Sequence, residues 1–378
     1  MLEDNTNAEI IKNYYAGKKV LVTGDTGFKG SWLSLWLSYL GAHVYGIGLP
    51  PVSKEDNFVL SELDSLISHT TLDICEYRAV YDYMEKISPD IVFHLAAQPL
   101  VRLSYETPRK TIETNVMGTV HVLDAVRLVP SIHTAIMITS DKCYENKEWV
   151  HGYRECDEMG GYDPYSASKG AAEIIIQSYL HSFFHDCNSA CIASVRAGNV
   201  IGGGDQAADR IIPDCIRSMR SGTDLIIRNP HALRPWQHVL EPLSGYLLLG
   251  AVLGVKRSSH GSAYCGEKQR LCGAWNFGPH YESIISVEKI VKTLFDIAGS
   301  GSYSIQSSSN NPHEASTLAL DVAKAALLLR WYPILDIHET LQWTWSGYQA
   351  EKSGKSVRTH RIQQIEEYMH RMDSVSRL

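Results

Sequence analysis

An α/β chain with a doubly wound, mostly parallel sheet is predicted by two features of the sequence. Short β-branched runs alternate with helical patterns, and glycine-rich or polar turns follow the runs. Parallel strands need crossover connections, so helices come to cover both faces of such a sheet. The expected strands are 18–23, 43–49, 69–74, 91–95, 135–139 and 190–196. The expected helices between them are 31–40, 79–87, 108–129 and 165–184.

Beyond about residue 200 the elements become shorter and the polar loops longer, as in a smaller lobe that closes over a ligand. We expect helices at 287–297, 321–329 and 337–350, and a loosely held charged helix at 359–378. Strand 273–277 is expected to return to the main sheet. The predicted sheet-based lobe is therefore 1–199 with roughly 234–258 and 273–278, and the ligand-binding lobe is 200–233 with 259–378.

Composition excludes several classes of protein. The formal net charge is -7, without the clustered Lys and Arg of a nucleic-acid-binding surface. The 8 cysteines show neither a CxxC pair nor a zinc-like Cys/His spacing, so we expect reduced thiols and no metal site. The beginning of the sequence is polar, and no apolar run approaches the roughly 18 residues of a membrane span. These features predict a soluble cytoplasmic protein that binds neither nucleic acid nor membrane.

A polar cluster ends the fifth expected strand. Ser140, Asp141 and Lys142 place a hydroxyl, a carboxylate and an amine together directly after an apolar β-branched run. In open α/β sheets, ligands bind beyond the carboxyl ends of the strands, so this cluster is a candidate for the chemistry. The alternative is a polar turn, since Ser and Asp favour turns for local reasons.

A glycine turn follows the first expected strand. Glycines at 24, 27 and 30 stand where a strand passes into a helix, so the backbone can approach a pyrophosphate at the helix N-terminus. This pattern predicts a Rossmann-type dinucleotide site made by Thr23, Gly24, Thr26, Gly27, Phe28, Lys29 and Gly30. About twenty residues on, where an acid would bind the adenosine ribose, the chain reads Gly48-Leu49-Pro50-Pro51, so spacing leaves NAD versus NADP open.

Two further positions add to the dinucleotide hypothesis. Asp73 and Ile74 end the third expected strand and are candidates for an adenine contact, although a solvated strand-end Asp is as good an explanation. Tyr165 and Lys169 lie one helical turn apart, so both point the same way. An ammonium beside a phenol favours phenolate and would make Tyr165 a base. Other Tyr/Lys pairs share this spacing, and only this one follows the strand that carries Ser140.

Five motifs together resemble the extended short-chain dehydrogenase/reductase family. They are TGDTGFKG (23–30), HLAAQP (94–99), TN (114–115), TSDKCYE (139–145) and PYSASK (164–169). Within that family, Asp141 beside Ser140 resembles the nucleotide-sugar 4,6-dehydratases. Lys142, where many relatives carry Glu, and RPWQHVLEPLSGYL (234–247) resemble the subgroup that acts on CDP-glucose. That subgroup is associated with 3,6-dideoxyhexoses of lipopolysaccharide O-antigen.

The resemblance implies ligands and their contacts. NAD would be the cofactor, bound by the glycine turn with Asp73, Ile74, Leu95, Ala96, Ala97, Thr114, Tyr165 and Lys169. The nucleotide-sugar substrate, CDP-glucose, would be bound by Gln98, Asn115, Arg196, Asn199, Arg210 and Arg234. Arginine suits a diphosphate because its fork can bind two oxygens, although any one of these could be a surface arginine.

The resemblance also implies a reaction. Tyr165, helped by Ser140, takes the proton from the 4-hydroxyl as hydride leaves C4, and Lys169 holds the nicotinamide ribose. Asp141 protonates the departing 6-hydroxyl. Lys142 stands where relatives have the C5 base and must be neutral to act; it could instead orient Asp141 or stabilise the enolate.

Two other functions stay open on the sequence. A sugar 4-epimerase would share Tyr165 and Lys169 but has no use for Asp141. A non-enzymatic NAD-binding regulator would be expected to lack the intact Tyr/Lys pair.

Helices 108–129 and 165–184 are expected to pair with a second subunit, giving a homodimer or a dimer of dimers. Helix 165–184 is apolar almost all round and must be covered on two sides. A covering helix within the chain is the alternative.

Overall fold

A parallel seven-stranded sheet forms the centre of the computed structural model, which describes residues 5–186, 188–258, 266, 270–306 and 317–375. Its order is β10-β6-β5-β4-β1-β2-β3, and all paired neighbours run parallel. The strands are β1 (Lys19–Thr23), β2 (His43–Gly48), β3 (Ser68–Thr71), β4 (Ile91–His94), β5 (Thr134–Ile138), β6 (Cys191–Ala197) and β10 (Gly273–Phe277). The predicted doubly wound sheet and the return of the strand at 273–277 are confirmed.

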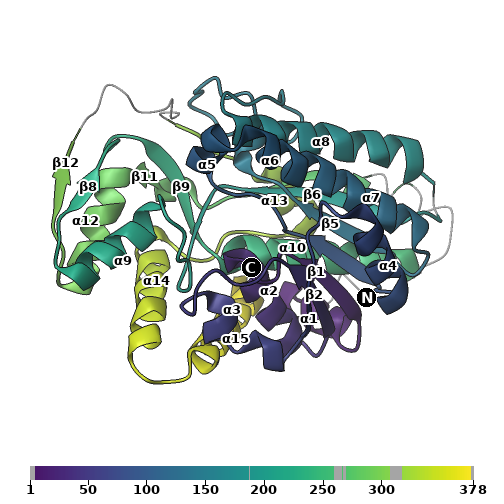
Figure 1. Cartoon of the computed structure of the whole chain (residues 1–378), viewed down its shortest axis with the longest axis horizontal. Coiled ribbons are helices and arrows are strands. Elements are labelled where there is room, and N and C mark those ends of the chain that lie inside the picture. Colours follow the sequence, from purple (N-terminus) through teal and green to yellow (C-terminus); the bar gives the residue numbers. More distant parts are fainter. Residues whose placement is uncertain (1–4, 187, 259–265, 267–269, 307–316, 376–378) are drawn as a thin grey trace.

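Helices cover both faces of the sheet (Figure 1). One face carries α4 (Tyr77–Ile87), α7 (Gly118–Leu128) and α8 (Pro164–Phe183); the other carries α2 (Phe28–Tyr39), α10 (Leu240–Ser258) and α13 (Ala323–Leu329). Successive residues of β1 divide between the two faces, because Val20 and Val22 belong to one buried cluster and Leu21 to the other. Each face therefore has its own apolar core, and the strands read as continuous hydrophobic runs.

The second lobe lies at the left of Figure 1 and is built from two small sheets and the helices beside them. β7 (Asn199–Ile201), β9 (Leu233–His238) and β11 (Ile284–Ser286) form one sheet, and β8 (Leu225–Ile227) pairs with β12 (Tyr303–Ile305). The helices are α9 (Ile211–Ser221), α12 (Val287–Ala298) and α14 (Ile337–Lys352). A separate apolar cluster joins these elements.

The boundaries between the lobes differ from the predicted ones. β9 pairs with β7 and β11, so 233–238 belongs to the second lobe, whereas α13 packs on β10 and α15 (Val357–Val375) packs on α1 (Asn7–Tyr15) and α2. The prediction missed this because an amphipathic helix does not indicate which lobe it covers. Residues 259–265, 267–269, 307–316 and 376–378 of the predicted second lobe lie outside the described residues.

The helix at the end of the chain is firmly packed, contrary to the expectation. Arg361 of α15 is fully buried, its Nη2 donates to Glu351 Oε1 at 2.9 Å, and its guanidinium lies 5.1 Å from the centre of the Trp32 ring. The Tyr368 hydroxyl donates to Glu241 Oε2 at 2.7 Å. These buried polar residues interrupt an apolar stripe that includes Ile365, Met369 and Met372, so the helix looked more solvated in the sequence than it is.

The short elements complete the chain. Three helices are short: α3 (Asn57–Leu60), α5 (Val101–Glu106) and α6 (Pro108–Ile112). Single 3₁₀ turns follow α3, β5 and β10; they are η1 (Leu63–Ser65), η3 (Asp141–Cys143) and η4 (Tyr281–Ser283). The predicted helix 108–129 is α6 and α7 joined by a π-helical turn, η2 (Glu113–Met117). Such turns are frequent at functional sites, and this one carries Thr114 and Asn115. Among the described residues, no helix is long and apolar enough to cross a membrane.

Candidate active site

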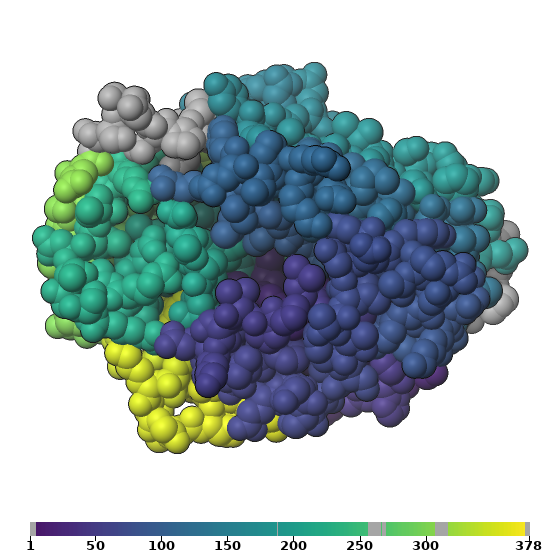
Figure 2. Space-filling model, viewed as in Figure 1, coloured from purple at the N-terminus to yellow at the C-terminus, as the bar shows by residue number. Residues whose placement is uncertain are grey.

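A cleft with a volume of about 1370 Å³ lies between the two lobes, beyond the carboxyl ends of β1, β4 and β5. The face in Figure 2 is hollowed near its centre, where the purple and blue first lobe meets the teal second lobe. Most of the predicted site residues line this cleft; from the first lobe these are Gly24, Thr26, Gly27, Phe28, Lys29, Gly30, Asp73, Ile74, Leu95, Ala96, Ala97, Thr114, Ser140, Asp141, Lys142, Tyr165 and Lys169.

The glycine turn brings backbone into close contact at one end of the cleft. Gly24 has a φ of +73°, and a Cβ there would lie 2.8 Å from Ala96 Cα. A Cβ on Gly30 would lie 2.0 Å from the carbonyl oxygen of Gly24, so α2 can begin directly beside β1 only with glycine here. Gly27 caps α2 without a side-chain hydrogen bond. The free N–H groups of the first turn therefore suit the pyrophosphate of a dinucleotide.

Thr23, a predicted cofactor contact, does not line the cleft. It is fully buried, accepts a hydrogen bond from the Ala96 N–H at 3.1 Å, and lies 2.8 Å from Nδ1 of His94. Burial lowers the pKa of His94 to about 3, so the ring is neutral and its Nδ1 can accept from Thr23. Thr23 therefore fixes the Leu95–Ala96 backbone beneath the ligand instead of touching the ligand, since a threonine at a strand end can face either side.

The part of the cleft around Asp73 has polar groups suited to an adenosine. Asp73 Oδ1 accepts from the Cys75 N–H at 2.9 Å, and Oδ2 lies 3.4 Å from Lys110 Nζ. Burial raises the pKa of Asp73, but these hydrogen bonds and the lysine outweigh it and lower the pKa overall. Beside Gly48, where sequence reasoning found no acid, the fully buried Asp25 places Oδ2 2.7 Å from His69 Nδ1.

The strand-end cluster has the geometry of a reactive site. Ser140 is the N-cap of η3: its Oγ accepts from the Lys142 N–H at 3.3 Å and donates to Asp141 Oδ1 at 2.9 Å. Asp141 is 2% exposed, and its other oxygen, Oδ2, has no hydrogen-bond partner among the described residues. Lys142 is partly exposed and lines the same cleft. The three side chains thus place hydrogen-bond donors and acceptors around one cavity at the end of β5.

Tyr165 and Lys169 reach the same cavity from α8. Asp163 caps this helix by accepting from the Ser166 N–H at 2.9 Å, and Pro164 fits its first position because proline needs no N–H donor there. Tyr165 therefore stands in the first turn, with its own N–H donating to Ser104 Oγ at 3.1 Å. The Tyr/Lys pair and the Ser140 cluster are brought together, as the sequence suggested.

The electrostatics of this pair differ from the expectation of a lowered phenol pKa. Burial raises the pKa of Tyr165 to about 12, although a hydrogen bond with Ser140 and the positive charge of Arg210 act in the opposite direction. Burial also lowers the pKa of Lys169 to about 8, against the opposing charge of Glu173. In this state the phenol is protonated at neutral pH, because desolvation outweighs every favourable neighbour.

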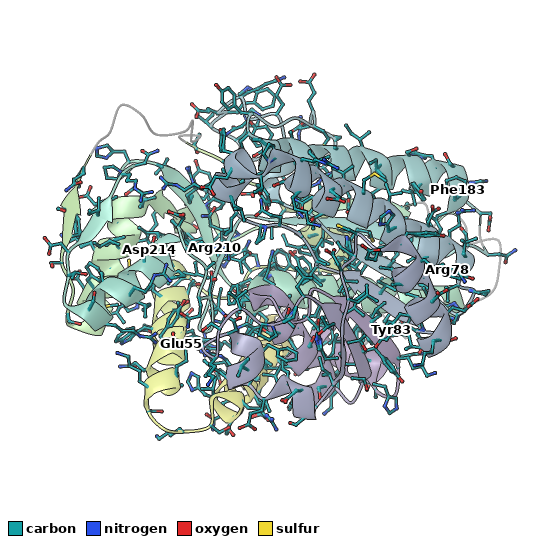
Figure 3. All side chains as sticks on the ribbon, viewed as in Figure 1. Glu55, Arg78, Tyr83, Phe183, Arg210 and Asp214 are labelled. Atoms are coloured by element: carbon teal, nitrogen blue, oxygen red, sulfur yellow. The ribbon has the colours of Figure 1, made fainter. Side chains whose placement is uncertain are left out.

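Three of the predicted substrate contacts line the second-lobe wall: Asn199, Arg210 and Arg234. Arg210 and Asp214, labelled in Figure 3, lie at the beginning of α9 beside the cleft. Arg210 Nη1 pairs with Asp205 Oδ2 at 3.0 Å, and Arg234 Nη1 donates to the carbonyl oxygen of Leu233 at 2.8 Å. Both guanidiniums can also meet an anionic ligand.

Gln98 and Asn115 lie outside the cleft lining. Asn115 Oδ1 accepts from the Gln98 N–H at 2.8 Å, and its Nδ2 donates to Ser168 Oγ at 2.8 Å. Gln98 Nε2 donates to Thr111 Oγ1 at 2.9 Å. The two side chains therefore tie the β4 loop to η2 and α8, and the prediction that they bind substrate does not fit this placement.

Arg196 is also displaced from its predicted role. Its side chain is 2% exposed and pairs inside the fold with Glu173, whose side chain is 1% exposed. The motif places Arg196 near the end of β6, but the strand alternates its side chains between the two faces, and this one faces the interior beneath α8.

The cleft holds further charged groups. Lys29, a predicted cofactor contact, lines it, and burial and the charges of Arg210 and Lys169 lower the pKa of its amine to about 8. Two other charged residues were not singled out from the sequence. Arg102 and Arg228 come from opposite lobes and lie 3.2 and 3.6 Å from the same oxygen of Asp209. The only signal for Arg228 was its place shortly before the RPWQHV motif.

The donor chemistry suits organic ligands. Within the described ranges, no group of three or more His, Cys, Asp and Glu side chains could hold a metal ion. Backbone N–H groups at one end, arginines at the other and the Ser140–Asp141–Tyr165 cluster between them fit a dinucleotide facing a second phosphorylated molecule.

Comparison with known proteins agrees with this geometry. Residues 21–344 match the family described as GDP-mannose 4,6 dehydratase. The chain is 46% identical over 364 residues to the CDP-glucose 4,6-dehydratase of Salmonella typhimurium, covering 95% of this chain and 98% of that one.

Solved structures share the fold. A UDP-glucose 4-epimerase from Thermotoga maritima has a TM-score of 0.71 at 19% identity, covering 88% of this chain and 99% of that one. A UDP-glucuronic acid 4-epimerase from Bacillus cereus, in complex with UDP-glucuronic acid and NAD, has a TM-score of 0.70 at 24% identity with the same coverage. The family match over most of the chain shows that this protein belongs to the GDP-mannose 4,6-dehydratase family, within the extended short-chain dehydrogenase/reductases.

Proposed function

We propose that this protein is an NAD-dependent hydro-lyase that converts CDP-D-glucose to CDP-4-dehydro-6-deoxy-D-glucose. The observation that carries the proposal is the pairing of two kinds of group in one cleft. Asp141 is buried, and its Oδ2 has no hydrogen-bond partner in the ranges that the structure describes. It follows Ser140 directly, and Ser140 hydrogen-bonds Tyr165. An acid beside an oxidising tyrosine suits elimination of water in addition to oxidation, and the CDP-glucose preference rests on the 46% identical relative.

The residues at the first-lobe end of the cleft fit NAD. The uncapped first turn of α2 would bind the pyrophosphate, Asp73 and Ile74 the adenosine, and Lys169 the nicotinamide ribose. When bound, NAD supplies a hydride acceptor for C4 of the sugar and returns the hydride to C6.

Oxidation at C4 belongs to Tyr165 and Ser140. Tyr165 Oη accepts the proton of the 4-hydroxyl as the C4–H bond breaks, and Ser140 Oγ hydrogen-bonds the same phenol. With a pKa of about 12, the phenol needs added positive charge to ionise near neutral pH. The charge of Arg210 already acts in this direction, and Lys169, one helical turn further along α8, lines the same cleft.

Elimination belongs to Asp141 and Lys142. The 4-ketone acidifies the C5 proton, which Lys142 takes in its neutral form, while Asp141 in its protonated form gives a proton to O6 as the C6–O bond breaks. Water leaves, and the ammonium of Lys142 returns its proton to C5. The proton that Tyr165 took from the 4-hydroxyl replaces the one that Asp141 gave, so the protons balance. The proton donor is Asp141 Oδ2, a buried oxygen that has no hydrogen-bond partner within the described part of the chain.

We further propose that the product enters 3,6-dideoxyhexose synthesis for lipopolysaccharide O-antigen, and that the enzyme works in the cytoplasm as a homodimer or a dimer of dimers. The dimer is supported by apolar side chains exposed on the π turn and α8, among them Met117 at 44%, Ile174 at 60% and Phe183 at 44%. The pathway is supported by the relatedness to CDP-glucose 4,6-dehydratase.

The test is substrate conversion. The purified protein is incubated with NAD and, separately, CDP-, GDP-, UDP- and dTDP-glucose, and the 4-keto product is measured by its absorbance in alkali. We expect product from CDP-glucose at a rate at least ten times that from the other sugars. Absence of product from CDP-glucose would contradict the proposal.

A further inference from the structure

An ion pair lies inside the protein directly behind the strand-end cluster. Glu173 of α8 accepts from Arg196 Nε at 2.9 Å and from Arg196 Nη2 at 2.8 Å, which is a two-point contact. A third donor, Ser194 Oγ, lies 2.7 Å from Glu173 Oε2. Both charged side chains are almost fully buried, so the pair is dry and its geometry is fixed by several bonds at once.

The pair reaches both ends of the segment that carries the strand-end cluster. Thr139, the residue before Ser140, donates from Oγ1 to Glu173 Oε1. Tyr144, the residue after η3, accepts from Arg196 Nη1 at 2.5 Å, and its ring centre lies 4.8 Å from the guanidinium. Tyr144 in turn donates to Asn276 Oδ1 of β10 at 2.8 Å.

We propose that Glu173 and Arg196 are positioning residues, which brace segment 139–144 against the helix that carries Tyr165 and Lys169. Glu173 follows Lys169 by one helical turn and Tyr165 by two, so the carboxylate that receives Thr139 is fixed on the same helix as the oxidising pair. The inference rests on the proposed function, because it concerns how the acid at 141 is aligned with the base at 165.

The physical reason is the sensitivity of catalysis to alignment. Proton donors and acceptors must meet the substrate within a few tenths of an ångström, and a displacement of about 1 Å can cost roughly 100-fold in rate. Ser140, Asp141 and Lys142 follow a short strand, and backbone hydrogen bonds hold their segment to β6 and to the loop before α8, from the Thr139 N–H to Val195 and from the Gly160 N–H to Cys143. The ion pair adds a side-chain link to α8 itself. Clamping the segment at 139 and at 144 fixes all three against α8.

Replacing Glu173 or Arg196 is a poor test, because each would leave a buried unpaired charge and could unfold the protein. The anchors are better targets. Thr139→Val removes the hydroxyl that reaches Glu173, and Tyr144→Phe removes the oxygen that reaches Arg196, while both keep the size of the side chain. Thr139→Ser keeps the hydroxyl and serves as the conservative rescue.

Thr134→Val is the matched control. Thr134 begins the same strand, β5, is fully buried, and its Oγ1 has no hydrogen-bond partner among the described residues. The same chemical change is therefore made in the same strand without touching the brace.

The experiment measures kcat and KM for CDP-glucose together with the thermal midpoint of each variant. We expect Thr139→Val and Tyr144→Phe to lower kcat at least tenfold with KM within twofold, and Thr139→Ser and Thr134→Val to stay within threefold of the parent. The brace is overturned if folded Thr139→Val and Tyr144→Phe keep kcat within threefold. It is equally overturned if Thr134→Val loses as much as Thr139→Val, since the loss is then a general effect on β5.

Failure of the proposed function gives a different result. An unmodified protein that does not convert CDP-glucose contradicts that function, and the brace, stated for this reaction, falls with it. If the parent is active and Thr139→Val and Tyr144→Phe keep its kcat, only the brace is contradicted.

Discussion

The chemistry depends on a few side chains whose surroundings differ sharply within one cleft. Asp141 is 2% exposed, and one of its oxygens has no hydrogen-bond partner among the residues described. For Tyr165, burial raises the pKa while a hydrogen bond with Ser140 lowers it. Groups with such different surroundings can take different steps of one reaction, which is how a single fold carries out both oxidation and elimination.

We predict that Asp141→Asn separates these two steps. General acid help is typically worth about 10²–10⁴-fold, and asparagine cannot give a proton to the departing O6, whereas oxidation at C4 uses Tyr165 and Ser140. Single-turnover absorbance at 340 nm, a wavelength at which NADH absorbs, should show NADH forming and persisting with little 6-deoxy product. A folded variant that makes 6-deoxy sugar at the parent rate contradicts the role of Asp141.

A second prediction concerns the charge of Lys169. Burial lowers its pKa to about 8, so the amine loses its proton, and Tyr165 its positive neighbour, as the pH rises above 8. The kcat of the parent should therefore fall above that pH. Lys169→Arg keeps its charge and should move this alkaline limb at least one pH unit higher, whatever its absolute activity. If kcat falls at the same alkaline pH in the parent and in Lys169→Arg, the titrating group is not Lys169.

The helices and strands show how far the sequence alone could go. The seven parallel strands and their glycine turn were predictable, because β-branched runs and a glycine-bearing strand end are local signals. The position of Arg196 was not, because a motif places a residue near a strand end without saying that Glu173, far away in the sequence, receives it. Gln98 and Asn115 were misassigned for the same reason, since their partners lie across the π turn and on α8.

The packing of α15 gives a prediction about stability. Glu241 of α10 accepts from the Leu335 N–H at 2.7 Å and from Tyr368 Oη of α15 at 2.7 Å, and burial raises its pKa to about 7. An acid whose pKa is raised by folding contributes stability that is present below the unfolded pKa and is lost as pH rises through the folded pKa.

Glu241→Gln, which does not titrate, should therefore gain stability relative to the parent by about 3 kcal/mol between pH 4 and pH 8. Urea unfolding at the two pH values measures the difference. The control is Glu367→Gln, which removes an exposed acid of α15 paired with Arg371 and should change the difference by about 0.5 kcal/mol or less. An unchanged difference for Glu241→Gln would contradict this account of the buried acid.

The contact between the two lobes and the contact between subunits involve larger surfaces than the catalytic cluster does. Charged side chains from the two lobes meet at the cleft, because Arg102 and Arg228 both form an ion pair with Asp209. On α8, by contrast, apolar side chains are exposed to solvent, and Ile174 is 60% exposed in the single chain. A helix with apolar residues on two sides needs cover on both.

We predict a dimer with about twice the 42.2 kDa mass of one chain, measured by light scattering at micromolar concentration. Ile174→Glu should shift the mass towards one chain, because a charge at the centre of an apolar interface is costly. Leu327→Glu changes a leucine that is 80% exposed on α13 and should leave the dimer intact. The proposed interface is contradicted if the parent has the mass of one chain, or if Ile174→Glu keeps the mass of a dimer.

The dehydratase account is tested most directly by following one hydrogen atom. CDP-glucose labelled with deuterium at C4 is converted with a catalytic amount of NAD, and the product is examined by NMR and mass spectrometry. If hydride leaves C4 and returns at C6, the deuterium appears in the C6 methyl group of a 4-keto-6-deoxy sugar and no NADH builds up. Deuterium found again at C4 would indicate a 4-epimerase, and deuterium retained in stoichiometric NADH an ordinary dehydrogenase; either result would contradict the account.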